Sequence, residues 1–288
     1  MLSPEQVRQY RTDGFTVCQG FLPEGEVDRF REEIEGICAG NTLAHHDSTL
    51  MEMEPAQPPE GNRVRRIYQP CHHFPEFGRL SHSDRLLDCV EQLLGPDLLI
   101  QYSKINMKPA DVGSVVEWHQ DLSYYPLTNR DSLAVLFYLD DASQSNGCLK
   151  IIPGRHTGPL LSHTRDGLFQ GRVTEPVDGS GAVFVEGGAG TAIFMHCMAP
   201  HASAPNTSSY QRRTLILSYR AADAFRIYDG QNTATSEAFV RLVRGRHRSV
   251  ARFTMNEFPI PTYEGKFVSL YDLQDKSRQS EAQQESVG

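Results

Sequence analysis

The sequence predicts a single domain with an antiparallel β core that is preceded by helices. Residues 1–95 contain segments in which apolar side chains recur at helical spacing, whereas residues 98–220 contain short runs rich in Ile, Leu, Val, Phe and Tyr. Gly, Pro, Asn and Ser separate these runs, as is typical of strands that are joined by turns. The length of 288 residues is enough for one large mixed or all-β domain, or for two small ones.

A first helix is predicted to begin after Ser3, which can cap its N-terminus. Pro4 suits the first helical position, and Gln6 completes a capping box. Gly14 ends this helix, and the apolar residues 15–22 predict a short strand directly after it.

Two further amphipathic helices are predicted. One covers residues 23–40 and places four apolar side chains on one face, namely Val27, Phe30, Ile34 and Ile37. The other covers residues 83–95, with Ser83 as its N-cap and Gly95 at its end.

Residues 41–75, between these two helices, contain several prolines and no sustained period. We expect a long, lid-like loop here, because long loops inside compact domains are usually functional lids or disordered segments. Within it, Val64–Tyr68 predicts a short strand. Residues 275–288 are mostly polar and predict a disordered tail, so the folded domain is expected to span residues 1–274.

The apolar runs predict five strands, at residues 98–109, 132–142, 148–154, 191–196 and 213–220. The tripeptide SNG at residues 145–147 predicts a hairpin turn between the second and the third of these strands.

The composition indicates a globular protein with an acidic balance. Hydrophobic residues make up 39% of the chain, charged residues 22%, and the formal net charge is −8. This charge argues against nucleic acid or an anionic membrane as the main partner. No apolar run approaches the roughly 18 residues of a membrane span, and the polar N-terminus does not predict a signal peptide. The six cysteines form no C-x-x-C motif, so we expect reduced thiols in a cytoplasmic protein.

The segment EWHQDLSYY, residues 117–125, contains two potential metal ligands. In an extended chain, His119 and Asp121 project from the same face, so both can reach one ion. The H-x-D pattern alone is weak, because it is common by chance, and a metal needs a third ligand from another strand. His196 and His201 are both candidates for that ligand on this reasoning.

Two histidines and one carboxylate on a β scaffold make the facial triad of non-haem Fe(II) oxygenases, which leaves positions open for a cosubstrate and O₂. Arg212 follows at the start of a predicted strand. An arginine offers a carboxylate a fixed two-pronged contact and keeps its charge when buried. A dicarboxylate cosubstrate is therefore compatible with this part of the chain.

Several segments, in this order, resemble the phytanoyl-CoA dioxygenase family of Fe(II)- and 2-oxoglutarate-dependent oxygenases. They are LSPEQVRQYRTDGFTVCQGFL, INMKP, WHQDLSYYPL, SNGCLKIIPGRHTGPL and HASAPNTSSYQRR. Together they span most of residues 3–225. The patterns H-x-D, N-G-C-L-x-x-x-P-G-x-H and H-x-S-x-x-N are specific when they occur together.

The resemblance implies a double-stranded β-helix core, the jelly-roll of cupin-like proteins, with flanking helices. It implies that His119, Asp121 and His201 bind the iron, which leaves His196 with a structural role. Because the carboxylate ligand Asp121 is present, halogenation, which needs that coordination position for chloride, is disfavoured.

The resemblance also implies a binding site for 2-oxoglutarate. Arg212 is the expected partner of the distal carboxylate, and Arg213 is the less favoured alternative because it points to the opposite face of an extended strand. Lys104, Gln120 and Ser203 fall at positions that line the cosubstrate pocket in relatives.

The implied reaction uses Fe(II), 2-oxoglutarate and O₂ to oxidise a C–H bond of a small organic molecule, with release of succinate and CO₂. The expected protein is a monomer or homodimer without nucleic acid or membrane partners. Two other classes stay open: a non-catalytic jelly-roll that binds a metal or senses a ligand, and a Zn²⁺ hydrolase that uses the same triad. Neither the residues nor the resemblance fixes the substrate.

Three arginines in the lid-like segment, Arg63, Arg65 and Arg66, are candidates for substrate binding. Arg63 and Arg65 share one face of a short strand, and Arg66 takes the other. A solvated basic patch is the simpler interpretation. The functional hypothesis is that at least one of these arginines faces the iron and binds an anionic or strongly polar group of the substrate.

Overall fold

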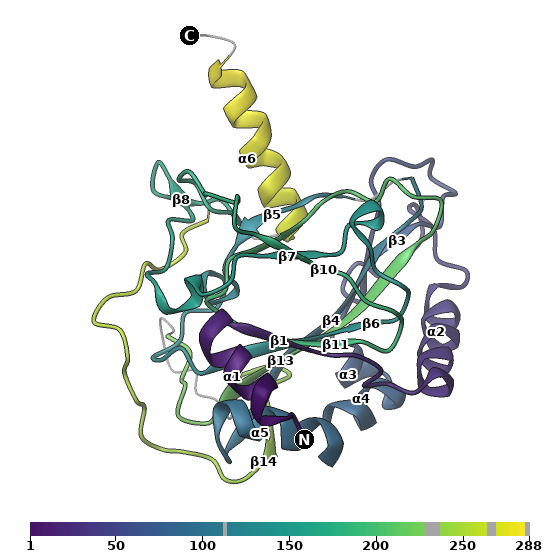
Figure 1. Cartoon of the computed structure of the whole chain (residues 1–288). Coiled ribbons are helices and arrows are strands. Elements are labelled where there is room, and N and C mark those ends of the chain that lie inside the picture. The colour runs from purple at the N-terminus through teal and green to yellow at the C-terminus, as the bar shows by residue number, and fades with distance from the viewer. Residues whose placement is uncertain (112–113, 228–236, 264–268, 286–288) are drawn as a thin grey trace.

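The chain folds into two antiparallel β-sheets that face each other, with helices packed on the outer side of the larger sheet (Figure 1). The computed structural model describes residues 1–111, 114–227, 237–263 and 269–285. An apolar layer between the sheets combines residues of both, such as Ile216 from the larger sheet and Ile151 from the smaller one. The predicted mainly-β fold with flanking helices is therefore confirmed, and two facing antiparallel sheets are the architecture of a jelly roll.

The larger sheet contains eight strands. Seven of them lie in the order β1 (Phe15–Cys18), β11 (Ala192–His196), β6 (Ser132–Tyr138), β13 (Arg212–Ala221), β4 (Leu98–Lys108), β3 (Val64–Tyr68) and β2 (Met51–Met53). The eighth, β14 (Arg241–Arg244), pairs with β4. The predicted strands at residues 15–22, 98–109, 132–142, 191–196 and 213–220 are all present, most of them slightly shorter than expected.

The smaller sheet has the order β10 (Val183–Val185), β7 (Leu149–Ile151), β12 (His201–Ser203) and β5 (Val116–His119). A separate short pair is formed by β8 (Thr164–Arg165) and β9 (Leu168–Phe169).

The predicted hairpin at residues 145–147 is wrong, because β6 and β7 belong to different sheets. The 3-10 turn η2 (Gln144–Asn146) carries the chain from one sheet to the other and ends at Gly147 with φ of 72°. A Cβ at this position would lie 2.3 Å from the carbonyl oxygen of Ala204. The turn residues of the SNG motif thus serve a crossover that packs against the segment after β12.

The helices form as their caps and apolar faces predict. In α1 (Pro4–Asp13), Ser3 and Gln6 form the predicted capping box. In α2 (Glu24–Cys38), the predicted apolar face is buried through Val27, Phe30 and Ile34. The helices α3 (Pro70–His73), α4 (Pro75–Ser81) and α5 (Asp84–Leu94) lie in the same layer. Ser83 is the N-cap residue of α5 as predicted, but its side chain makes no capping hydrogen bond, because its hydroxyl group donates to the carbonyl oxygen of Leu80.

The expectation of a long loop at residues 41–75 is only partly correct. The strand at Val64–Tyr68 is confirmed, but it pairs with β4 and with β2, so the segment extends the larger sheet at its edge. Burial explains this placement, because Ile67 is 0% exposed and packs in the core under the helices.

The expectation of a disordered tail from residue 275 is wrong for residues 275–285. These residues continue α6 (Leu270–Glu285), which begins beside β5 and projects away from the body of the molecule (Figure 1). The helix packs through Leu270 and Tyr271 and through the polar residues Gln274 and Ser277, all of them buried. Residues 286–288 lie outside the described part of the chain.

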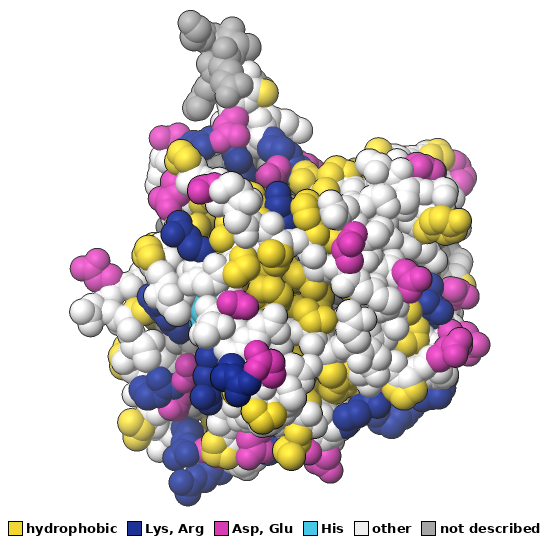
Figure 2. All heavy atoms as spheres, viewed as in Figure 1, with side chains coloured by type: hydrophobic (Ala, Val, Ile, Leu, Met, Phe, Trp, Pro, Cys, Tyr) yellow, Lys and Arg dark blue, Asp and Glu magenta, His cyan; other side chains and the backbone are white. Residues whose placement is uncertain are grey.

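The surface carries charges of both signs. Figure 2 shows Lys and Arg side chains mixed with Asp and Glu side chains over one face, with apolar side chains between them. Within the described residues, no helix combines the length and the apolar character that crossing a membrane requires. All six cysteines are free thiols.

Candidate metal centre and active-site cavity

The last residue of β5 and the first residue of β12 bring two histidines together. His119 and His201 are direct partners in the antiparallel register, and their ring centroids are 4.0 Å apart. Direct partners project from the same face of a sheet. Gln120 is extended, with φ of −121° and ψ of 128°, so the side chain of Asp121 returns to the side of His119.

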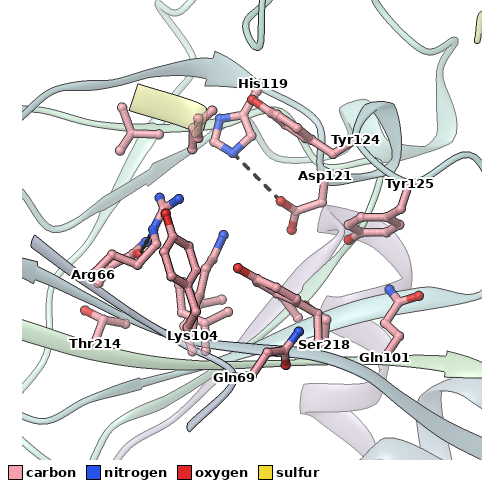
Figure 3. A pocket seen from close by; sticks show the side chains of 18 of the residues that line it. Arg66, Gln69, Gln101, Lys104, His119, Asp121, Tyr124, Tyr125, Thr214 and Ser218 are labelled. Carbon is pink, nitrogen blue, oxygen red and sulfur yellow. Dashed lines mark hydrogen bonds and ion pairs between the residues drawn. The ribbon is translucent and has the colours of Figure 1, made fainter. Parts of the chain in front are cut away.

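The three side chains form a compact, buried His-Asp-His cluster. The carboxylate oxygen Oδ1 of Asp121 lies 3.8 Å from Nε2 of His119 and 3.9 Å from Nε2 of His201. All three potential ligand atoms lie within 4.8 Å of one another, and no second group of this kind occurs among the residues that the structure describes. Figure 3 shows Asp121 and His119 directed toward one another at the cavity.

Backbone carbonyl groups fix the orientation of both imidazoles. Nδ1 of His119 donates to the oxygen of Glu117 at 2.8 Å, and Nδ1 of His201 donates to the oxygen of Ala199 at 3.0 Å. A carbonyl oxygen can only accept, so the proton is on Nδ1 and the lone pair of each Nε2 is directed into the cluster. Burial lowers the pKa of His119 well below its ordinary value and also lowers the pKa of His201. Two neutral imidazoles and one carboxylate fit the donor set for Fe(II).

The structure separates the two candidates for the third ligand. His196 ends β11, and its Nδ1 accepts a hydrogen bond from the backbone N–H of Met198 at 3.0 Å. Its ring packs near those of Tyr10 and His156 rather than near the cluster. His196 therefore has a structural place, whereas His201 lies in the cluster.

A cavity of about 660 Å³ lies between the two sheets beside the cluster. His119, Asp121 and His201 line it from the smaller sheet and the segment after β5, and Lys104 and Arg212 line it from the larger sheet. This volume suits a small-molecule ligand together with a cosubstrate.

The neighbouring residues Arg212 and Arg213 point in opposite directions from β13. Arg212 is 5% exposed, lines the cavity, and donates from Nη1 to Oγ1 of Thr214 at 2.9 Å. Its Nε has no hydrogen-bond partner in the described part of the protein. Arg213 instead forms a two-pronged pair with Asp140, at 3.0 and 2.8 Å, on the outer side of the sheet.

Of the three other predicted cosubstrate residues, two line the cavity and one does not. Lys104 and Ser203 line the cavity. Burial and the nearby Arg66 lower the pKa of Lys104 to about 8, although Asp121 acts in the opposite direction.

Gln120 does not line the cavity, which corrects its predicted role. Its side chain donates to the oxygen of Met198 at 2.8 Å and accepts from the backbone N–H of Leu161 at 2.7 Å. In an extended chain, the residue between His119 and Asp121 must face away from both of them.

The three arginines of the β3 region lie in different environments. Arg63 is exposed, Arg65 is 3% exposed and packs beside Glu52, and Arg66 is 4% exposed and lines the cavity. Nε of Arg66 donates to Oδ1 of Asn106 at 3.0 Å, and its Nη2 has no hydrogen-bond partner among the described residues. Figure 3 shows Arg66 and Lys104 extending toward His119 and Asp121 from the facing side. The expectation that at least one of the three faces the cavity is met by Arg66.

Several cavity residues were not singled out from the sequence. Strand alternation could have found some of them, because the lining residues recur at every second position: Tyr102, Lys104 and Asn106 on β4, and Arg212, Thr214, Ile216 and Ser218 on β13. Tyr124 and Tyr125 follow the H-x-D motif directly. Leu270, at the start of α6, lines the cavity without any sequence signal.

The jelly-roll core, the buried His-Asp-His cluster and the cavity arginine define the class of 2-oxoglutarate-dependent non-haem iron dioxygenases. The model of the phytanoyl-CoA dioxygenase family matches residues 10–214, and the chain belongs to this family. The predicted family and reaction class are thereby confirmed.

Two relatives that align over most of their length are named as dioxygenases. The chain is 31% identical over 263 residues to a probable alpha-ketoglutarate-dependent hypophosphite dioxygenase of Stutzerimonas stutzeri, covering 89% of this chain and 90% of that protein. It is 26% identical over 241 residues to the ectoine dioxygenase of Bordetella parapertussis, covering 77% and 76%.

Among solved structures, the chain resembles EctD from S. alaskensis with 2-oxoglutarate and 5-hydroxyectoine. The TM-score is 0.65 and the sequence identity 25%, with 78% of each chain covered. The jelly-roll architecture that the sequence predicts is thus shared with a protein whose crystal structure contains 2-oxoglutarate.

Proposed function

We propose that this dioxygenase oxidises a small molecule that carries an anionic group, and that Arg66 binds this group beside the iron. The observation that carries the proposal is a buried guanidinium group in the cavity wall, with one nitrogen that has no hydrogen-bond partner in the described residues. Leaving a buried donor unpaired costs about 1–3 kcal/mol, and more for a charged group. A bound anion would remove this cost.

His119, Asp121 and His201 are the proposed iron ligands. The two Nε2 atoms already carry lone pairs that point into the cluster, so iron can bind without a change of tautomer. Bound Fe(II) supplies O₂ activation coupled to decarboxylation of 2-oxoglutarate to succinate and CO₂. The chain supplies orientation of both substrates in a cavity between the two sheets.

Arg212 is the proposed partner of the distal carboxylate of 2-oxoglutarate. Its guanidinium group is buried and retains one unpaired nitrogen, and the hydroxyl group of Thr214 holds it in place. Ser203 and Lys104 line the same cavity and are proposed to contact the cosubstrate. Gln120 is not part of this proposal, because its hydrogen bonds lie outside the cavity.

The charges of the cavity favour an anionic substrate in addition to the cosubstrate. Iron and 2-oxoglutarate together are neutral, since a divalent cation meets a dianion. Asp121 then offsets one of the three positive charges on Arg66, Arg212 and Lys104, which leaves two positive charges in excess near the cluster. Burying unpaired charge is costly, so a substrate anion would stabilise the loaded site. The name of the hypophosphite dioxygenase relative is consistent with an anionic substrate.

The remaining cavity wall suits an organic substituent. Tyr102, Tyr124 and Tyr125 present aromatic surface, and Leu136 and Ile216 present aliphatic surface. We propose hydroxylation of a C–H bond as the outcome. The carboxylate of Asp121 would take the coordination position that a halide needs, so halogenation is not proposed.

Succinate formation tests this proposal. Protein with Fe(II), 2-oxoglutarate and O₂ is incubated with a panel of small carboxylic, sulfonic and phosphonic acids, and with the neutral ester or amide of each. We expect acids, and not their neutral counterparts, to stimulate succinate release. In Arg66→Met, the KM for the stimulating acid should rise while the KM for 2-oxoglutarate stays within about twofold. Equal stimulation by neutral analogues, or a selective rise in the 2-oxoglutarate KM, would refute the role of Arg66.

The same assay separates the other two classes of protein. A zinc hydrolase would need neither O₂ nor 2-oxoglutarate, and a binding protein would release no succinate. For the setting of the enzyme, we propose a cytoplasmic monomer or homodimer without nucleic acid or membrane partners. The net charge of −8 and the free thiols support this.

A further inference from the structure

An aromatic ring from the C-terminal helix lies against two guanidinium groups at the edge of the cavity. The ring centroid of Tyr271 is 4.8 Å from Cζ of Arg66 and 4.5 Å from Cζ of Arg65. We infer that Tyr271 on α6 and Glu52 on β2 are positioning residues for Arg66, which makes the C-terminal helix a part of the active site. This inference rests on the proposed function of Arg66 as the substrate-anion ligand.

Glu52 holds the same group from a second direction. Its carboxylate pairs with Arg65, accepts from the hydroxyl group of Tyr68 at 2.9 Å, and lies 3.9 Å from Nη1 of Arg66. Asn106 accepts from Nε of Arg66 at 3.0 Å. The ring, the carboxylate and the amide thus contact the guanidinium group of Arg66 on several sides, and its Nη2 has no hydrogen-bond partner among the described residues.

The helix that carries Tyr271 is tied to the strand that carries His119. Gln274 is 0% exposed; its side chain accepts from the backbone N–H of Glu117 at 3.0 Å and donates to the oxygen of Gly171 at 2.6 Å. Arg278 pairs with the carboxylate of Glu117 at 2.9 Å. The helix α6 therefore connects the two walls of the site. Gln274 and Arg278 contact Glu117 on β5, and Tyr271 contacts the guanidinium groups on β3.

Preorganisation explains why this contact matters for binding. A free arginine side chain loses rotamer entropy when it binds a ligand. Stacking on an aromatic ring and pairing with Glu52 restrict Arg66 before the ligand arrives, so less entropy is lost on binding. Removal of the ring should weaken anion binding, without an effect on the ligands of the metal.

Calorimetry with methylphosphonate as the probe tests the inference. The anion is titrated, without O₂, into full-length protein that has been loaded with Fe(II) and 2-oxoglutarate. We expect Tyr271→Leu to weaken methylphosphonate binding about five- to tenfold, and Tyr271→Phe to stay within twofold of the parent because it keeps the ring. Glu52→Gln, which leaves no cavity in the core, should weaken binding to a similar extent as Tyr271→Leu.

A matched control separates positioning from simple docking of the helix. Glu281 pairs with Arg165 and Arg172 further along α6, away from Arg66. Glu281→Gln should bind methylphosphonate like the parent, and all four variants should keep the parent affinity for 2-oxoglutarate.

The outcomes distinguish the inference from the proposal beneath it. If Arg66→Met weakens methylphosphonate binding and neither Tyr271→Leu nor Glu52→Gln does, the positioning role is refuted while the anion site stands. If the parent does not bind the probe, or if Arg66→Met binds it equally well, the anion site itself is refuted and the inference falls with it.

Discussion

His119 and His201 lie directly opposite each other in the antiparallel pair of β5 and β12, with their ring centroids 4.0 Å apart. This register fixes two of the three proposed iron ligands on a rigid backbone ladder. The third, Asp121, follows on the same chain segment after a single extended residue. The metal centre is therefore preorganised by β-structure rather than by a mobile loop.

The first prediction concerns the ligands of the iron. His201→Ala should lose most of its Fe(II) and its succinate formation, because two ligands cannot replace the three-ligand set. His196→Ala should keep its iron, since the His196 ring bonds to the backbone of Met198 instead. Metal content after anaerobic reconstitution is the measurement. Retention of iron in His201→Ala together with its loss in His196→Ala would reverse the assignment.

The second prediction uses two neighbouring arginines with different roles. Arg212→Met should raise the KM for 2-oxoglutarate by about tenfold to a hundredfold, because a charge-assisted hydrogen bond contributes roughly 1.5–3 kcal/mol. Arg213→Met should leave that KM unchanged, since Arg213 pairs with Asp140 on the outer side of the sheet.

The substitution Arg213→Met should instead lower the stability of the folded protein. The free energy of unfolding should fall by about 1–3 kcal/mol, because the carboxylate of Asp140 loses its two-pronged contact with the guanidinium group of Arg213. Denaturant unfolding of both variants, together with succinate kinetics, checks the pair. An equal effect of both substitutions on 2-oxoglutarate would show that β13 acts as a whole rather than through Arg212.

The third prediction concerns the C-terminal helix. Gln274→Leu should lower the free energy of unfolding by about 2 kcal/mol, because the backbone N–H of Glu117 and the carbonyl group of Gly171 lose their partner. Gln279, which is exposed on the same helix, provides the control. Gln279→Leu should change stability by no more than about 0.5 kcal/mol. Equal unfolding midpoints for the two variants would mean that α6 does not dock as described.

The fourth prediction is a pH dependence that comes from Lys104. Burial and Arg66 lower its pKa in the folded protein to about 8, whereas the unfolded chain has a value of about 10.4. Below pH 8 the buried charge destabilises the ligand-free fold to its full extent. Between pH 8 and about 10.4 the folded state loses its proton first, so this destabilisation fades as the pH rises.

Lys104→Met should therefore stabilise the ligand-free protein at pH 7 relative to the parent, and the gain should shrink toward pH 10. The measurement is denaturant unfolding of both proteins at the two pH values. A difference in unfolding free energy that stays constant between them would contradict the lowered pKa of Lys104.

Local patterns in the sequence predicted much of the fold. The capping box at Ser3 and the strand at Val64–Tyr68 depend on neighbours close in the chain, and both form as expected. The hairpin at residues 145–147 failed for the opposite reason. The turn residues are compatible with several connections, and in the folded chain they form a crossover between the sheets at which Gly147 packs against Ala204.

The C-terminal helix shows where apolar periodicity fails as a criterion. Its buried residues are Leu270, Tyr271, Gln274 and Ser277, of which only the first two carry apolar or aromatic side chains. A polar helix face is expected to contact solvent, unless the groups that would pair with its side chains are known. The partners, such as Glu117 and Gly171, come from distant parts of the chain.

The sequence by itself determined the chemistry of the metal centre. The alternation of an extended chain places His119 and Asp121 on one side, and the resemblance of the motif around His201 to the family implies the third proposed ligand. Only the tertiary structure decided which other side chains face that centre. Arg66 reaches the cavity because β3 pairs with β4, and Tyr271 contacts it because α6 docks beside β5. Such contacts depend on sheet order and on burial of polar surface, which no local pattern of residues encodes.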